Sequence, residues 1–193
     1  MKIGTLLFSI LAISLMLGIA SGNAVAQGDS STYFTTYYSN ANTSGAPDGT
    51  VRIINDGDTG GNLWASIYVF DDSQELQECC SCEVTPDGLL SESVNVNLTA
   101  NALTGKKPTR GVIKVISSSS SDPTADEPTT GLRVWSTHVQ RATATAGAFY
   151  VTETKAADSN LSSGEQALLQ NLCYYDSLLS GLPCSCTPED HDF

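Results

Sequence analysis

Two clusters of cysteines constrain the fold of this chain more than any other feature. The first cluster holds Cys79, Cys80 and Cys82, and the second holds Cys173, Cys184 and Cys186. Adjacent cysteines rarely bond to each other, because the backbone geometry is strained. We therefore expect disulfides between the clusters, which would tie the C-terminal end to a point about 100 residues earlier. The spacing does not determine which cysteines pair.

The same six cysteines allow a second interpretation, in which their thiolates hold Cu(I) or Zn²⁺. Their spacing differs from the paired C-x₂-C motifs of zinc ribbons. An oxidising compartment also favours disulfides over thiolates. Metal handling by the cysteines therefore remains the less favoured alternative.

The first 26 residues have the pattern of a secretory signal peptide. Lys2 precedes an apolar run over residues 6–20, and Ala24-Val25-Ala26 fits the small-x-small rule for cleavage before Gln27. The alternative is a retained membrane anchor, but the apolar run is shorter than the roughly 20 residues that span a bilayer. We expect a secreted or cell-surface protein, with the periplasm as a further possibility, and no membrane span after cleavage.

Composition favours a single acidic domain. The chain has 21 acidic and 9 basic residues and a formal net charge of −12. This charge repels nucleic acid and anionic membrane surfaces, and it suits solubility or cation binding. We expect residues 27–49 to form an N-terminal strand with a linker, and residues 50–193 to form the main domain.

Short stretches of alternating apolar and polar residues predict an antiparallel β-sandwich. The predicted strands span residues 30–39, 50–54, 63–70, 93–99, 111–117, 132–139 and 148–154. Turn signals rich in Gly, Asn, Asp and Pro separate them, which is typical of all-β folds. The loop over residues 117–130 is rich in Ser and Pro, and we expect it to be mobile.

The end of the chain changes to helical spacing. A helix is predicted over about residues 162–180, with Ser162 as N-cap and Glu165 completing a capping box. Its apolar stripe consists of Leu168, Leu172, Tyr175 and Leu179, with Leu169 and Cys173 beside it. The predicted fold is thus mainly β, with one C-terminal helix and a disulfide-linked tail.

Sequence motifs for catalysis are missing. The chain contains no nucleophile elbow, no His-Glu-x-x-His zinc helix, no phosphate loop and no dinucleotide fingerprint. Of the two histidines, His138 lies within a predicted strand and His191 lies in the charged tail. We therefore predict no catalytic residues and a protein that is not an enzyme.

One loop has the composition of a calcium site. Asp56, Asp58 and Asn62 alternate with glycines, and carboxylate and amide oxygens are ligands that Ca²⁺ prefers. Asp71 and Asp72 would join them if the loop folded beside the end of the following strand. The alternative is a solvated hairpin loop, because Asp, Asn and Gly also favour turns.

The predicted strand near the mature N-terminus carries aromatic residues on both faces. Phe34 and Tyr38 lie on one face, and Tyr33 and Tyr37 lie on the other. Such a strand needs partners on both sides. It either completes the sheet of its own chain or inserts into the sheet of a neighbouring subunit.

These features favour a secreted, non-catalytic structural or cell-surface protein that self-assembles through its N-terminal strand. The first alternative is an extracellular binding module for Ca²⁺, carbohydrate or protein, with Trp64 or Trp135 as a platform for sugars. The second alternative is the metal handling described above. No cofactor other than Ca²⁺ is expected.

Overall fold

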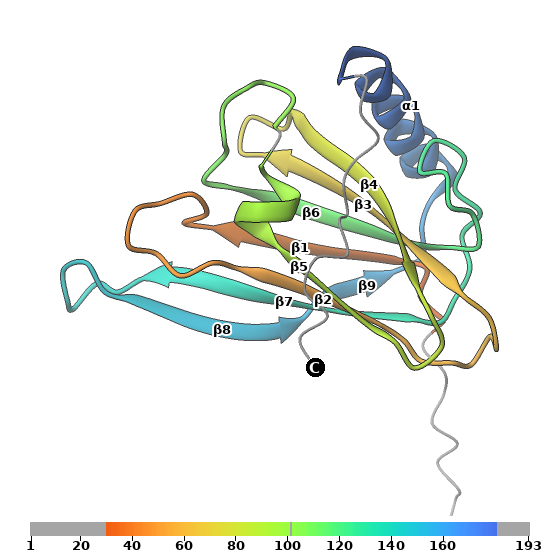
Figure 1. Cartoon of the computed structure of the whole chain (residues 1–193), viewed down its shortest axis with the longest axis horizontal. Helices are drawn as coiled ribbons and strands as arrows, with labels where there is room; N and C mark the ends of the chain where they lie inside the picture. Colours follow the sequence, from red (N-terminus) through yellow and green to blue (C-terminus); the bar gives the residue numbers. More distant parts are fainter. Residues whose placement is uncertain (1–29, 101, 181–193) are drawn as a thin grey trace, which may run out of the picture.

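Two stacked antiparallel β-sheets and one helix form the body of the protein (Figure 1). The computed structural model describes residues 30–100 and 102–180. The elements are β1 (Tyr33–Ser39), β2 (Thr50–Asn55), β3 (Leu63–Asp71), β4 (Leu76–Val84), β5 (Leu89–Ser93), the π-helical turn η1 (Val94–Leu98), β6 (Arg110–Ser118), β7 (Leu132–Arg141), β8 (Phe149–Lys155), β9 (Ala157–Ser159) and α1 (Ser163–Ser180).

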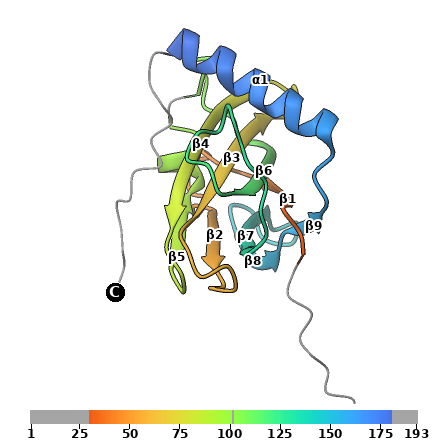
Figure 2. The ribbon, with the colours of Figure 1, turned by 90° about the vertical axis from the view of Figure 1, so that its right-hand side faces the viewer.

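The first sheet has the strand order β4-β3-β6-β1-β9, and the second has the order β5-β2-β7-β8. All neighbouring strands are antiparallel. α1 lies over the outer face of the first sheet (Figure 2). This arrangement confirms the predicted sandwich with a C-terminal helix.

The main core lies between the two sheets. The predicted strand over residues 63–70 corresponds to β3, which directs Ala65, Ile67 and Val69 into this core, since alternate residues of a strand point to the same face. The opposite face of β3 carries Tyr68 and Phe70, which pack in a second cluster beneath α1. Because both faces are covered, seven of the nine residues of β3 are buried.

The buried face of α1 differs from the predicted one. Leu169 and Cys173 are fully buried, whereas Leu168 and Tyr175 are 50% and 62% exposed. The predicted stripe was therefore wrong by one residue, or about 100° around the helix. The covalent attachment of Cys173 to β4, which spacing alone does not reveal, decides which face packs inward.

The start of α1 also corrects a detail of the capping box. The Ser162 hydroxyl accepts a hydrogen bond from the Glu165 backbone N–H at 3.1 Å, as predicted. The Glu165 carboxylate instead accepts hydrogen bonds from Tyr33 Oη at 2.9 Å and Lys114 Nζ at 2.5 Å. Glu165 therefore attaches the helix to β1 and β6.

Residues 93–99 do not continue as the predicted strand. After Ser93 the chain forms η1, in which Val94 and Leu98 are buried and Val96 is 70% exposed. Side chains form hydrogen bonds here with backbone groups that a strand would use for pairing. Ser93 Oγ accepts from the Val96 N–H, and Thr99 Oγ1 donates to the Val94 carbonyl. Such local hydrogen bonds favour a turn over a strand.

The sequence did not predict two strands, β4 and β5, which follow one another across a short turn and belong to different sheets, β4 to the first and β5 to the second. β4 contains the first cysteine cluster and lies at an edge of the first sheet. Its register with β3 shifts near Val69, so that one extra residue, Gln77, lies opposite a continuous β3. This bulge places Leu76 and Cys79 on the same face, toward α1.

Candidate functional site

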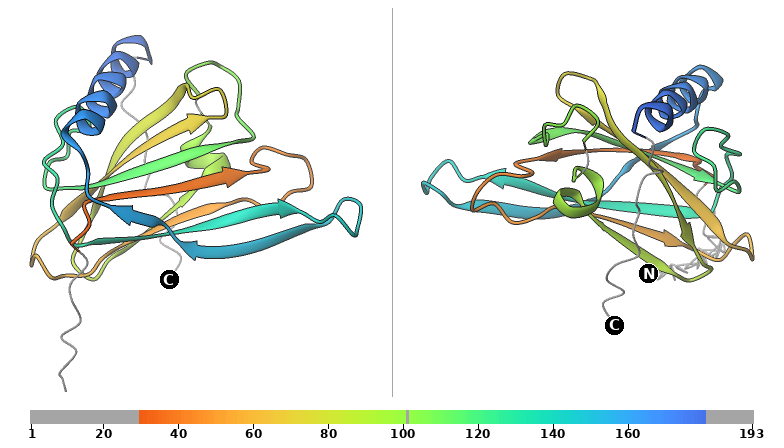
Figure 3. Two further views of the ribbon diagram at one scale, coloured as in Figure 1. Left: turned by 180° about the vertical axis from the view of Figure 1, so that it is seen from behind. Right: turned by 45° about the horizontal axis from the view of Figure 1, so that its top comes forward.

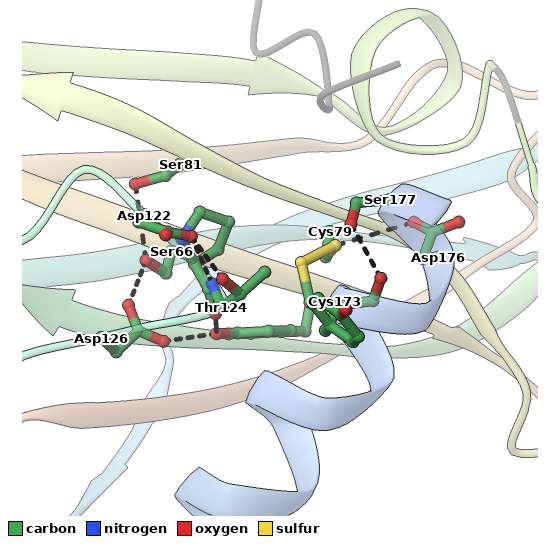
Figure 4. The surroundings of a disulfide bond; sticks show 12 residues. Ser66, Cys79, Ser81, Asp122, Thr124, Asp126, Cys173, Asp176 and Ser177 are labelled. Atoms are coloured by element: carbon green, nitrogen blue, oxygen red, sulfur yellow. Dashed lines mark hydrogen bonds between the residues drawn. A yellow bond between two sulfur atoms is a disulfide. The ribbon is translucent and has the colours of Figure 1, made fainter. Parts of the chain in front are cut away.

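A pocket of about 390 Å³ opens where β4, α1 and the β6–β7 loop meet. Its polar lining includes Ser81, Ser121, Asp122, Thr124, Asp176 and Ser177. The Cys79–Cys173 disulfide, Pro123 and Tyr174 provide its apolar surface. Figure 4 shows that these groups come from three segments that are far apart in the sequence.

The disulfide fixes one side of this pocket. Cys79 and Cys173 are 94 residues apart in sequence and 5.7 Å apart between their Cα atoms. The Asp176 carboxyl oxygen Oδ2 lies 3.6 Å from the Cys79 sulfur (Figure 4). Burial raises the pKa of Asp176. Since a disulfide sulfur has no proton, only a protonated Asp176 can donate a hydrogen bond along this contact.

The β6–β7 loop, predicted to be mobile, is attached to the sheet and to the helix. The buried Asp126 carboxylate accepts hydrogen bonds from Ser66 Oγ at 2.5 Å and from Tyr68 Oη. Its backbone carbonyl accepts from the Gln166 and Gln170 side chains of α1. Burial raises the pKa of Asp126 to about 6 despite these hydrogen bonds. These contacts fix the loop wall of the pocket.

The chemistry of the lining limits what the pocket can hold. Hydroxyl groups donate and accept hydrogen bonds, and carboxylates accept them. Among the lining residues there is no lysine, arginine or histidine. This part of the structure therefore offers no positive charge to an anionic ligand and no histidine to activate a serine.

A second surface is formed by β8, an edge strand of the second sheet. Every residue after Phe149 in this strand is exposed, including Tyr150 at 60% and Val151 at 51%. Its pairing with β7 is regular over all seven residues. The β7–β8 hairpin projects from the body, as Figure 3 shows. One side of β8 thus presents backbone groups that a further strand can pair with.

The predicted assembly residues lie in β1, within the sheet of their own chain. β1 pairs with β6 on one side and β9 on the other. Tyr33, Phe34 and Tyr38 are buried, and Tyr37 is 46% exposed. The Tyr37 ring stacks on His138 with 4.1 Å between ring centroids.

Both ring nitrogens of His138 have hydrogen-bond partners within the fold. Its Nδ1 lies 3.1 Å from the Tyr37 carbonyl oxygen, and its Nε2 lies 2.7 Å from Thr154 Oγ1. Because a carbonyl only accepts, Nδ1 donates and Nε2 accepts in the neutral ring. His138 therefore connects the two sheets, and His191 lies outside the described residues.

The five residues of the predicted calcium site do not come together. Asp56, Asp58 and Asn62 precede β3, whereas Asp71 and Asp72 lie at its other end, about 26 Å away for a strand of this length. In the described residues, no group of three or more His, Cys, Asp or Glu side chains has the arrangement of a metal site.

Several of these side chains have protein partners. Asp56 Oδ2 lies 3.0 Å from Arg133, and Asn62 donates to Glu83. At the other end of β3, Asp72 lies 2.7 Å from Arg110. Asp71 accepts hydrogen bonds from backbone N–H groups of its turn. Calcium binding by the 56–62 loop alone remains a prediction.

The cysteines follow the expected connection between clusters for one pair, Cys79–Cys173. Cys82 is disulfide-bonded as well, and Cys80 is buried in the main core. Cys184 and Cys186 lie outside the described residues. As a disulfide, Cys79 and Cys173 are not available as thiolate ligands.

The sequence did not identify the pocket. Asp176 and Cys173 lie three residues apart, which places them on one face of a helix. That spacing was the available signal for a polar group beside the disulfide. Asp122 gave no comparable signal, because only the folded loop brings it to the helix.

Comparisons with known proteins identify no family. No family model matches the chain, and no curated protein matches it. Among solved structures it is similar to the crystal structure of Thermotoga maritima 1070, with 12% sequence identity and a TM-score of 0.42. The match covers 68% of this chain and 95% of that one. In residues 30–100 and 102–180, no helix has the length and apolar character needed to cross a membrane.

Proposed function

We propose that this chain is an exported structural protein that associates with further copies of itself through the edge strand β8. The observation that carries the proposal is the seven-residue β8, which is regular, exposed and open to pairing along one side. Export is supported by the leader-like first 26 residues and by the Cys79–Cys173 disulfide, since such bonds persist in oxidising compartments.

The other edges of the two sheets are less suited to this role. β9 has three residues and β5 has five. β4 is long, but it contains a bulge and is tied to α1 through Cys79. Short, bulged or covered edges resist pairing with other chains. β8 combines length, regularity and exposure.

Charge also favours β8. Each copy carries a net charge of −12, so two copies repel each other across most of their surfaces. The segment 149–152 contains no charged residue. Two β8 strands that pair antiparallel about a two-fold axis at Thr152 place Val151 opposite Glu153 of the second copy and bring no like charges directly together.

Sedimentation velocity over a range of protein concentrations tests the proposal. We expect the wild type to form dimers or larger species. Val151→Lys should weaken association at least tenfold, because a lysine on an edge strand opposes pairing with another chain. Val96→Lys is the matched control, since Val96 is also exposed but lies in η1. A wild type that is monomeric up to millimolar concentration would disprove the proposal.

Deleting residues 27–40 separates this mechanism from donation of the N-terminal strand. β1 lies between β6 and β9, and it contributes Phe34 and Tyr38 to the main core. We therefore expect the truncated chain not to fold, as judged by near-UV circular dichroism. A folded, monomeric product would instead support strand donation through β1.

A further inference from the structure

We propose that the pocket beside the Cys79–Cys173 disulfide binds a neutral sugar unit. The pocket, of about 390 Å³, is at the small end of the range for ligand sites. This volume suits one or two sugar rings rather than a long chain. The inference is independent of β8, which does not contribute to the pocket lining.

The lining carries the mixture of groups that sugar hydroxyls require. Asp122 Oδ1 already accepts from the Thr124 backbone N–H and hydroxyl, at 2.8 and 2.7 Å. Its second oxygen, Oδ2, accepts no hydrogen bond from the described residues and remains available to a ligand hydroxyl. The Ser177 hydroxyl donates to the Tyr174 carbonyl, so its oxygen is left as an acceptor.

The serine on the β4 side supplies a donor. The Ser81 hydroxyl oxygen lies 3.5 Å from Ser66 Oγ, whose single proton is donated to Asp126 Oδ1 at 2.5 Å. A contact of 3.5 Å is weak, so the Ser81 hydroxyl can turn its proton toward a ligand oxygen. Acceptors on the loop and the helix thus face a donor on the strand, and a sugar hydroxyl both donates and accepts.

Apolar surface lies next to these polar groups. Tyr174 is 51% exposed and lines the pocket together with Pro123 and the disulfide. A sugar ring has a hydrophobic C–H face and a hydroxyl rim, which such a pocket can cover at the same time. The absence of basic residues from the described lining leaves anionic ligands without a counter-charge.

The walls are fixed before a ligand arrives. The disulfide holds α1 on β4, and Asp126 holds the loop to β3 and α1. Tyr68 Oη, which contacts the Asp126 carboxylate, also lies 2.7 Å from the Pro123 carbonyl oxygen. Pre-organised walls reduce the entropy lost on binding, which small ligands with few contacts need most.

Chemical-shift mapping by NMR on the purified protein tests this inference. Cellobiose, maltose and N,N′-diacetylchitobiose would be titrated into ¹⁵N-labelled protein. We expect at least one of them to shift the backbone amides of Ser81, Thr124 and Ser177. Asp122→Asn and Tyr174→Ala should each weaken that binding at least tenfold.

Matched variants separate the pocket from the general surface. Tyr175→Ala removes the neighbouring exposed tyrosine, which does not line the pocket, and it should leave affinity unchanged. Spermidine and CaCl₂ test cationic ligands, and shifts at the pocket with either of these and with no sugar would overturn the inference. No response at the pocket to any sugar would overturn it as well. Neither result would alter the oligomer measurement on Val151→Lys.

Discussion

β4 and β8 are the two long edges of the sandwich, one in each sheet. Of the nine residues of β4 only Glu83 is exposed, whereas in β8 every residue after Phe149 is exposed. β4 is bulged and covalently bonded to α1. Two ion pairs of β8 lie at the surface, Arg52–Glu153 at 2.6 Å and Lys155–Asp158 at 2.8 Å.

The difference shows two ways of treating unpaired backbone groups. An edge that is covered and cross-linked cannot accept a further strand. An edge protected by exposed charges alone stays accessible, because such pairs are weak and screened by salt. Substitutions that change the protection of one edge at a time test this difference.

The largest expected effect comes from removing the cross-link at β4. Replacing Cys79 and Cys173 together by alanine should lower the free energy of unfolding by about 4 kcal/mol, because the unfolded chain loses the closure of a 94-residue separation. Urea unfolding of the variant and the wild type measures this. A loss below about 1 kcal/mol would show that α1 is held by its apolar contacts instead.

The second-largest effect concerns two buried carboxyl groups, one on β4 and one on β5. Glu78 and Glu92 are 5% and 1% exposed, and each has an Oε2 atom without a hydrogen-bond partner in the described residues. Burial raises the pKa of both carboxyls to about 7, and the charges of Asp176 and Glu92 add to the shift of Glu78.

The sign of the pH effect follows from these values. The pKa of Glu92 is about 7 in the folded protein against 4.5 for the free side chain, so the folded state holds the proton more tightly. Its contribution to stability is complete below pH 4.5 and is lost as the pH rises through 7. The wild type should therefore become less stable between pH 5 and pH 8.

Glu92→Gln should remove the part of this pH dependence that comes from Glu92, while the part that comes from Glu78 remains. The variant is expected to be more stable than the wild type by roughly 1–3 kcal/mol at pH 8, because no charge is buried, and to be similar at pH 5. Thermal unfolding at both pH values measures the difference. If the variant and the wild type differed in stability by the same amount at pH 5 and pH 8, the result would contradict burial of an ionisable Glu92.

The smallest effect is expected at β8. Glu153→Gln removes one exposed ion pair, in which the side chains of Arg52 and Glu153 are 39% and 44% exposed. The free energy of unfolding should change by less than about 0.5 kcal/mol. Association should strengthen slightly, since Glu153 is the one acidic residue of β8. Weaker self-association of this variant by sedimentation velocity would show that the charge takes part in pairing.

Local pattern predicted much of the fold correctly. Alternation identified β1, β2, β3, β6, β7 and β8 within a few residues, and the Ser162 cap located the start of α1. It missed β4, since a run of cysteines and acids has no alternation of polar and apolar side chains. It missed the turn η1, since the hydrogen bonds of Ser93 and Thr99 depend on their neighbours.

By itself the sequence determined the class of fold, the helix and the connection between the cysteine clusters, because these depend on local spacing and on chain composition. Only the tertiary structure decided that β1 lies inside a sheet and β8 at an edge, although both are seven-residue strands that contain aromatic residues. It also decided that the β6–β7 loop reaches α1 and forms a pocket there. The physical reason is that strand order and loop placement depend on contacts between distant residues, which a local pattern does not encode.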